Sequence, residues 1–135
     1  MLRYLFYYSA IINLVFGIAF LLLPQNLGSA YAAPLNDAAI VVGRYFGAAL
    51  LPLAYLSWVA ATAPSSALKL ALVRVVAASQ LLGLIVAILA MSAGTIGAAG
   101  GILNIVLEVT SIVGFGYYGF VNTEDAMHRE AAPAH

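Results

Sequence analysis

The chain contains no cysteine and few charged residues, and each shortage excludes a class of function. Without cysteine, the protein has no disulfides, thiolate metal sites or cysteine nucleophiles. Charged side chains make up only 7% of the 135 residues and the formal net charge is +0, so no basic patch is available for nucleic acid. Soluble domains are about a quarter charged. Because 64% of the residues are hydrophobic, we expect an integral membrane protein.

The residues that cofactor sites and active sites need are equally scarce. Both histidines, His128 and His135, lie near the C-terminus and outside every apolar run, which argues against haem ligands within a membrane. The sequence has no HExxH motif, no glycine-rich phosphate loop and no Ser-His-Asp set. Glu124, Asp125 and His128 are close enough in sequence to contact a metal, but a short charged stretch is typical of a solvated turn. We expect no metal and no cofactor, and a non-catalytic role in preference to an enzymatic one.

Four long apolar runs predict four membrane spans, at about 3–23, 38–60, 67–92 and 98–121. A helix needs roughly 20 mostly apolar residues to cross a bilayer. Runs of this length must be helical, because open strands leave backbone groups unsatisfied in lipid. Short connections join the runs, so we predict an all-α, polytopic, up-and-down bundle of four transmembrane helices. Residues 122–135 form a short polar tail.

The breaks between the runs contain residues that begin and end helices. Pro24 stops the first run, and Asn36 or Asp37 is an expected N-cap for the second. Ser65 or Ser66 is the corresponding cap for the third run.

The first run has a second interpretation as a signal peptide. The tripeptide Ala30-Tyr31-Ala32 imitates a small-x-small cleavage site. The apolar stretch exceeds the ~7–15 residues of a usual signal sequence, so we expect it to remain as the first span.

Positive charge predicts the orientation of the bundle. Arg3, Lys69, Arg74 and Arg129 fall on or near one side, whereas the opposite loops carry only Asp37. Positively charged loops face the cytoplasm. We therefore expect both termini in the cytoplasm, with the protein in the bacterial inner membrane.

Two of these cations are expected to bind lipid headgroups. Lys69 and Arg74 lie near the inner end of the third span, where long cationic side chains reach out to anionic headgroups. A contact between Arg74 and Glu124 or Asp125 of the tail is the alternative.

Polar residues within the spans predict a buried cluster. Glu108 is the only acid inside a span, and Arg44 is the only cation not explained by the inner boundary. Asn13, Gln80 and Glu108 all lie near the mid-plane, about 15–18 Å from a helix end. Arg44 and Asn104 lie about 9 Å below the outer helix ends, and an arginine is long enough to reach down one turn. An unpaired charge at that depth costs at least ~2.5–3.5 kcal/mol. We therefore predict an Arg44–Glu108 ion pair, with Asn104, Asn13 and Gln80 completing the hydrogen bonds.

Three roles are open for this cluster. In the first, the cluster is a structural link between helices, because interhelical polar contacts determine which helices face each other. In the second it is a site, with Glu108 carrying a proton or Arg44 binding an anionic group. In the third, Arg44 points outward and does not meet Glu108.

Glycines predict where helices approach closely. Gly43 and Gly47, with Ala39, form a small-residue seam along the second span. Gly83 lies near the edge of the Gln80 face of the third span. We expect Gly43, Gly47 and Gly83 to be helix-packing positions.

One pattern in the first half of the chain carries a family resemblance. The stretch Gly17–Pro24, then Gly28, then the stretch Gly43–Leu51 and Trp58 resembles small bacterial four-helix membrane proteins of unknown function, loosely DoxX-like. Arg44 before the aromatic-Gly-Ala sequence is its most distinctive element. The resemblance implies the four-helix fold and residence in a membrane, and hardly any function.

Two functions follow from these observations as hypotheses. The first is a non-catalytic accessory or structural subunit that packs with other membrane proteins or with itself, surrounded by membrane lipids. The small-residue seams and the near absence of mass outside the membrane favour it. The second is a proton-coupled carrier or binder of a small lipophilic or anionic ligand that uses Glu108 and Arg44.

Overall fold

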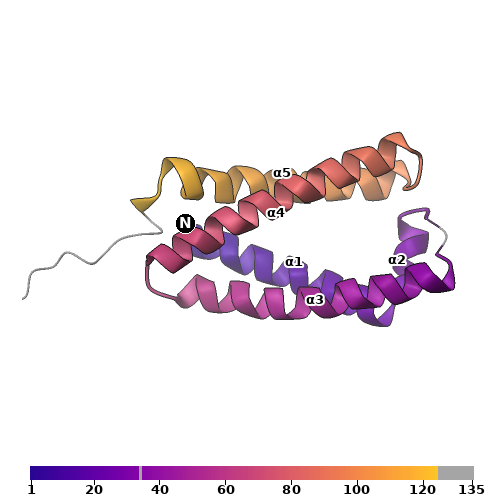
Figure 1. Cartoon of the computed structure of the whole chain (residues 1–135), viewed down its shortest axis with the longest axis horizontal. Helices are drawn as coiled ribbons and strands as arrows, with labels where there is room; N and C mark the ends of the chain where they lie inside the picture. Colours follow the sequence, from indigo (N-terminus) through magenta and orange to yellow (C-terminus); the bar gives the residue numbers. More distant parts are fainter. Residues whose placement is uncertain (34, 125–135) are drawn as a thin grey trace, which may run out of the picture.

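A computed structural model describes residues 1–33 and 35–124, and helices are the only regular secondary structure within them (Figure 1). The helices are α1 (Leu2–Leu22), α2 (Pro24–Ala30), α3 (Asp37–Thr62), α4 (Ala67–Ser92) and α5 (Ala98–Gly116), which continues as a π-helical turn η1 (Tyr117–Val121). Most of the predicted tail, including Asp125, His128 and Arg129, lies outside the described residues.

Four of these helices are long and apolar enough to cross a membrane: α1, α3, α4 and the continuous segment Ala98–Val121. The predicted all-α, four-span bundle is therefore confirmed. The short helix α2 was not predicted, because the sequence 24–37 contains mainly turn residues. Pro24 is nevertheless well suited to begin a helix, since the first helical residue needs no bonded backbone N–H.

Side-chain caps begin two of the spans. The Asn36 Oδ1 accepts a hydrogen bond from the backbone N–H of Ala39 at 2.9 Å. The Ser66 Oγ accepts one from the backbone N–H of Lys69 at 3.2 Å. These bonds satisfy donors at the helix starts that have no partner within the helix. The caps predicted in these two breaks are confirmed.

The spans pair as two antiparallel hairpins, α1 with α3 and α4 with α5 (Figure 1). Glycines allow α1 and α3 to approach closely, because a Cβ at Gly47 would lie 2.7 Å from the Gly17 carbonyl oxygen. The seam of the second span thus faces α1 of the same chain. Gly43 has more room, with the nearest atom, Phe20 Cδ1, 3.6 Å from an added Cβ.

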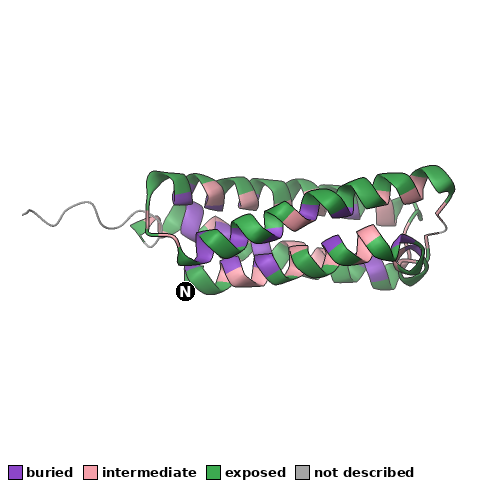
Figure 2. Ribbon diagram, turned by 90° about the horizontal axis from the view of Figure 1, so that it is seen from below, coloured by how far each residue is buried: buried purple, intermediate pink, exposed green. Residues whose placement is uncertain are grey.

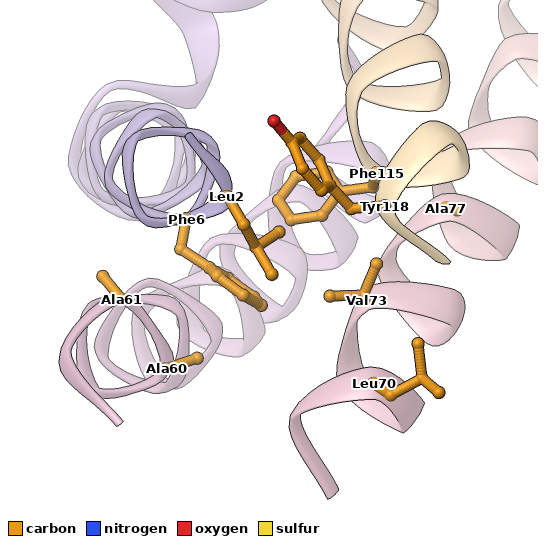
Figure 3. Close-up of a cluster of buried hydrophobic side chains, with 9 residues drawn as sticks. All are labelled: Leu2, Phe6, Ala60, Ala61, Leu70, Val73, Ala77, Phe115 and Tyr118. Atoms are coloured by element: carbon orange, nitrogen blue, oxygen red, sulfur yellow. The ribbon is translucent and has the colours of Figure 1, made fainter. Parts of the chain in front are cut away.

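A buried apolar cluster joins the two hairpins at the end of the bundle that holds Met1 (Figure 3). Its rings Phe6 and Phe115 meet edge to face, with centroids 5.2 Å apart. Its residues are Leu2, Phe6, Ala60, Ala61, Leu70, Val73, Ala77, Phe115 and Tyr118. The outer surface is dominated by exposed residues, many of them large and apolar (Figure 2). A lipid-facing surface accounts for such exposure, which soluble proteins rarely tolerate.

Candidate functional site

A cavity of about 550 Å³ lies between the two hairpins, between the apolar cluster and the opposite end of the bundle. We term it the inter-hairpin cavity. Every helix except the terminal turn contributes to its wall. The lining residues are Tyr8, Ser9, Ile12, Asn13, Phe16, Phe20, Leu27, Gly28, Tyr31, Ala33, Leu35, Phe46, Leu50, Leu53, Ser79, Gln80, Gly83, Ile96, Asn104, Leu107, Glu108 and Ser111.

Helical periodicity gives the cavity one apolar wall and one polar wall. From α3, the lining residues are Phe46, Leu50 and Leu53, which recur along one face and are all apolar. From α5, Asn104, Glu108 and Ser111 follow the same spacing and are polar, beside the apolar Leu107. The cavity is therefore amphiphilic across its width.

Glu108 is the acidic residue of the polar wall. Its carboxylate lies over Gly83 of α4, where an added Cβ would collide with both carboxylate oxygens. The carboxylate also interacts with the backbone of Leu84. Within the described residues, the buried Oε2 atom has no hydrogen-bond partner. Gly83 is thus a packing position, as predicted, but it accommodates a side-chain carboxylate and not a helix backbone.

Asn13 takes part in a separate polar chain between α1 and α3. Its Nδ2 donates to the Ser9 Oγ at 3.2 Å, and the Ser9 and Ser57 hydroxyls are 3.3 Å apart. Ser9 and Ser57 are both buried. These hydrogen bonds satisfy the buried hydroxyl groups of Ser9 and Ser57 where the first hairpin is tightly packed.

Tyr31 connects the two hairpins at the end opposite the apolar cluster. Its hydroxyl donates to Asn104 Oδ1 at 2.8 Å, and its carbonyl accepts from the Gly97 N–H at 2.6 Å. Its ring covers Gly100, where any Cβ would collide with it. Burial raises the pKa of the Tyr31 phenol above its usual value of 10.0. In the sequence, Tyr31 stands out only within the small-x-small tripeptide, and the glycines Gly97 and Gly100 are the signal for a docked ring.

The structure brings together four of the five residues of the predicted cluster. Asn13, Gln80, Asn104 and Glu108 all line the inter-hairpin cavity, from three different spans. They surround a cavity and do not form a packed hydrogen-bonded core.

Arg44 is not part of this arrangement. It is exposed, and no ion pair joins it to Glu108 in the part of the chain that the structure describes. The reason is the rotation of the helix. Leu53 lines the cavity, and the nine residues from Arg44 to Leu53 turn the helix by about 180°, so Arg44 points away from the cavity. The ion pair predicted from depth alone is therefore wrong, and the third role, with Arg44 pointing outward, describes its position.

The two expected headgroup-binding cations differ from each other. Lys69 is only 8% exposed, and its Nζ donates to the Ala63 carbonyl at 2.8 Å. It thus binds the C-terminal end of α3, where a cation is favourable, and a headgroup contact of Lys69 stays a prediction. Arg74 is exposed, and its Nε donates to the Gly119 carbonyl of η1 at 2.9 Å. A headgroup contact from the rest of its guanidinium stays a prediction.

Comparisons with known proteins return no relatives. No protein-family model matches the chain, and neither a curated protein nor a solved structure matches it. The DoxX-like resemblance of the first half therefore stays a prediction, and any function has to be argued from the inter-hairpin cavity.

Proposed function

We propose that this multi-pass membrane protein binds a small, mostly apolar ligand in the inter-hairpin cavity, with Glu108 holding the ligand's polar end. The observation that carries the proposal is the buried, unpartnered Oε2 of Glu108 in the wall of a cavity of about 550 Å³. Binding sites for small molecules typically have ~300–1,000 Å³ and apolar walls with a few polar groups. A buried polar atom without a partner is costly, and a ligand that bonds to it offsets that cost.

The alternative hypothesis is a structural subunit that packs with other membrane proteins or with a second copy. One observation in its favour is the small-residue seam at Gly43 and Gly47, but this seam faces α1 of the same chain. The seam is therefore not available to a partner, and the near absence of mass outside the membrane is the support that remains. The outer apolar surface is available to membrane lipids in either case.

We further propose that the protein resides in the bacterial inner membrane with both termini in the cytoplasm. Arg3, Lys69 and Arg74 lie toward the end of the bundle that holds Met1, whereas Asp37 lies at the other end. This asymmetry supports the orientation through the preference of cations for the cytoplasmic side.

Filling the cavity tests the ligand-binding proposal. The double variant Ile12→Trp/Leu107→Trp adds an indole from each of two facing walls, since both residues line the cavity. We expect a lipophilic molecule to co-purify with the unaltered protein in mild nonionic detergent. The double variant should retain it at least about tenfold less, because one steric clash of a few kcal/mol suffices for that factor. Organic extraction and mass spectrometry of the purified proteins measure the amount.

The matched control is Val15→Trp/Val106→Trp on the same two helices. Val15 and Val106 are 56% and 55% exposed and do not line the cavity. This control should retain the molecule like the unaltered protein. Equal retention by both double variants would mean that the molecule binds the outer surface, and the proposal would be wrong. A stable stoichiometric complex with another membrane protein, with no bound lipophile, would support the structural-subunit alternative.

A further inference from the structure

The charge of the inter-hairpin cavity restricts the ligand that it accepts. Among its described lining residues there is no lysine, arginine or histidine, and Glu108 is the one carboxylic acid. Arg44, the nearest candidate for a counter-charge by depth, is exposed on the far side of α3. An anionic ligand would therefore meet a carboxylate without any cation to offset it.

The polar group that lacks a partner at this wall is an acceptor. Glu108 Oε2 is a carboxylate oxygen that has no hydrogen-bond partner within the described residues. The Ser79 hydroxyl donates to the Val76 carbonyl at 2.9 Å, which leaves its oxygen as a second acceptor. The wall also carries amide donors, because Asn104 accepts from Tyr31 through its oxygen and keeps its amide nitrogen as a donor. A ligand group at Glu108 thus has to donate hydrogen bonds.

Resting on the proposed function, we propose that the ligand is a lipophilic amine whose ammonium group binds the Glu108 carboxylate. An ammonium group supplies the positive charge that the described wall lacks, together with N–H donors for Glu108 Oε2. Its apolar part would lie against Phe46, Leu50 and Leu53 of the opposite wall. A charge-assisted bond in this low-dielectric setting is stronger than a neutral one, so the amine is distinguished from an alcohol of the same shape.

A matched probe series tests this inference on the unaltered protein. The probes are phenylbutylamine, phenylbutanol and phenylbutyrate, which share one apolar part and differ in the head group. Calorimetric titration in nonionic detergent at neutral pH measures each affinity. We expect the amine to bind at least about tenfold more tightly than the alcohol, the usual advantage of a hydrogen bond to a charged group. Phenylbutyrate should bind most weakly.

The variant Glu108→Gln keeps the shape of the side chain and removes its charge. It should weaken binding of the amine by about tenfold and change binding of the alcohol by less than about twofold. Glu108→Asp, which keeps the charge, should retain a preference for the amine over the alcohol. The comparison among probes needs no variant, so a folding defect in Glu108→Gln would leave it intact.

The outcomes separate the two proposals. If the alcohol or the acid binds as tightly as the amine, or no amine binding occurs, the amine inference is overturned. The ligand-binding proposal still stands in that case if Ile12→Trp/Leu107→Trp loses its co-purifying molecule. If the double variant retains that molecule like its control, the ligand-binding proposal fails and the amine inference fails with it.

Discussion

Tyr31 combines a half-buried phenol, a backbone hydrogen bond and a ring packed on glycine, all directed at the start of α5. These contacts fasten the loop after α2 across one end of the inter-hairpin cavity, because Tyr31, Ala33 and Leu35 line that cavity. Ala32 next to it has a positive φ of 50°, which is uncommon for a residue other than glycine. The position of the loop therefore depends on the docking of Tyr31.

We predict that Tyr31→Phe loosens this loop without unfolding the bundle. The variant loses the bond to Asn104 and keeps the ring on Gly100. Losing one hydrogen bond of this kind costs about 1 kcal/mol, which lowers protection from hydrogen exchange about fivefold. Exchange of the backbone amides of residues 31–33, which are hydrogen-bonded in the docked loop, reports it when measured by mass spectrometry.

The raised pKa of Tyr31 makes the same docking sensitive to alkaline pH. The docked phenol holds its proton more tightly than a free phenol, whose pKa is 10.0. Docking is therefore fully stable below pH 10 and weakens as the pH rises through the higher pKa of the docked state. Tyr31→Phe should abolish this opening of the docked loop at alkaline pH. Tyr45→Phe, at a residue that is 72% exposed, should keep it. Alkaline opening that persists in Tyr31→Phe would contradict the assignment.

Single residues also show what the sequence could predict about the site. Asn13, Gln80, Asn104 and Glu108 were found because polar side chains are rare inside membrane spans. Arg44 lies away from the site that its depth in the membrane predicts. Depth follows from the sequence, whereas the rotation of α3 relative to its neighbours does not. Tyr31 was missed because no periodic pattern determines where a loop residue docks; only the tertiary contact with α5 does.

At the scale of elements, the helices and their caps were predictable but their pairing was not. Hydropathy, Pro24 and the caps Asn36 and Ser66 determine the bounds of the spans locally. Pairing depends on which glycine faces which backbone, and this requires the structure. Gly17 of α1 and Gly47 of α3 meet, with an added Cβ at Gly47 lying 2.7 Å from the Gly17 oxygen.

We predict that Gly47→Ala destabilises the first hairpin and that Gly43→Ala does not. At Gly47 the added methyl would meet two backbone atoms, the Gly17 oxygen and the Leu21 nitrogen, each at 2.7 Å. Backbone atoms cannot move aside cheaply, so we expect a loss of about 1–3 kcal/mol. At Gly43 the nearest atom is at 3.6 Å, an ordinary contact, and the better helix propensity of alanine should keep or slightly raise stability. Thermal unfolding in detergent compares the two, and equal midpoints would show that the close approach is absent.

At the scale of the whole molecule, the two ends of the bundle are built differently. The end that holds Met1 is sealed by the apolar cluster around Phe6 and Phe115. The other end holds α2 and the loop docked by Tyr31, beside the inter-hairpin cavity. Arg3, Lys69 and Arg74 lie toward the sealed end. The cavity and the loop docked by Tyr31 therefore lie toward the end that we expect to face away from the cytoplasm.

The absence of cysteine makes this orientation directly measurable, because a single introduced thiol has no background. Ala67 and Ala93 are both exposed and lie at opposite ends of α4, so Ala67→Cys and Ala93→Cys are matched reporters. In intact spheroplasts of a bacterial host, a membrane-impermeant maleimide should label Ala93→Cys at once. It should label Ala67→Cys only after permeabilisation, because cations keep that end in the cytoplasm. The reverse pattern would overturn the orientation, and immediate labelling of both would show that α4 does not cross the membrane.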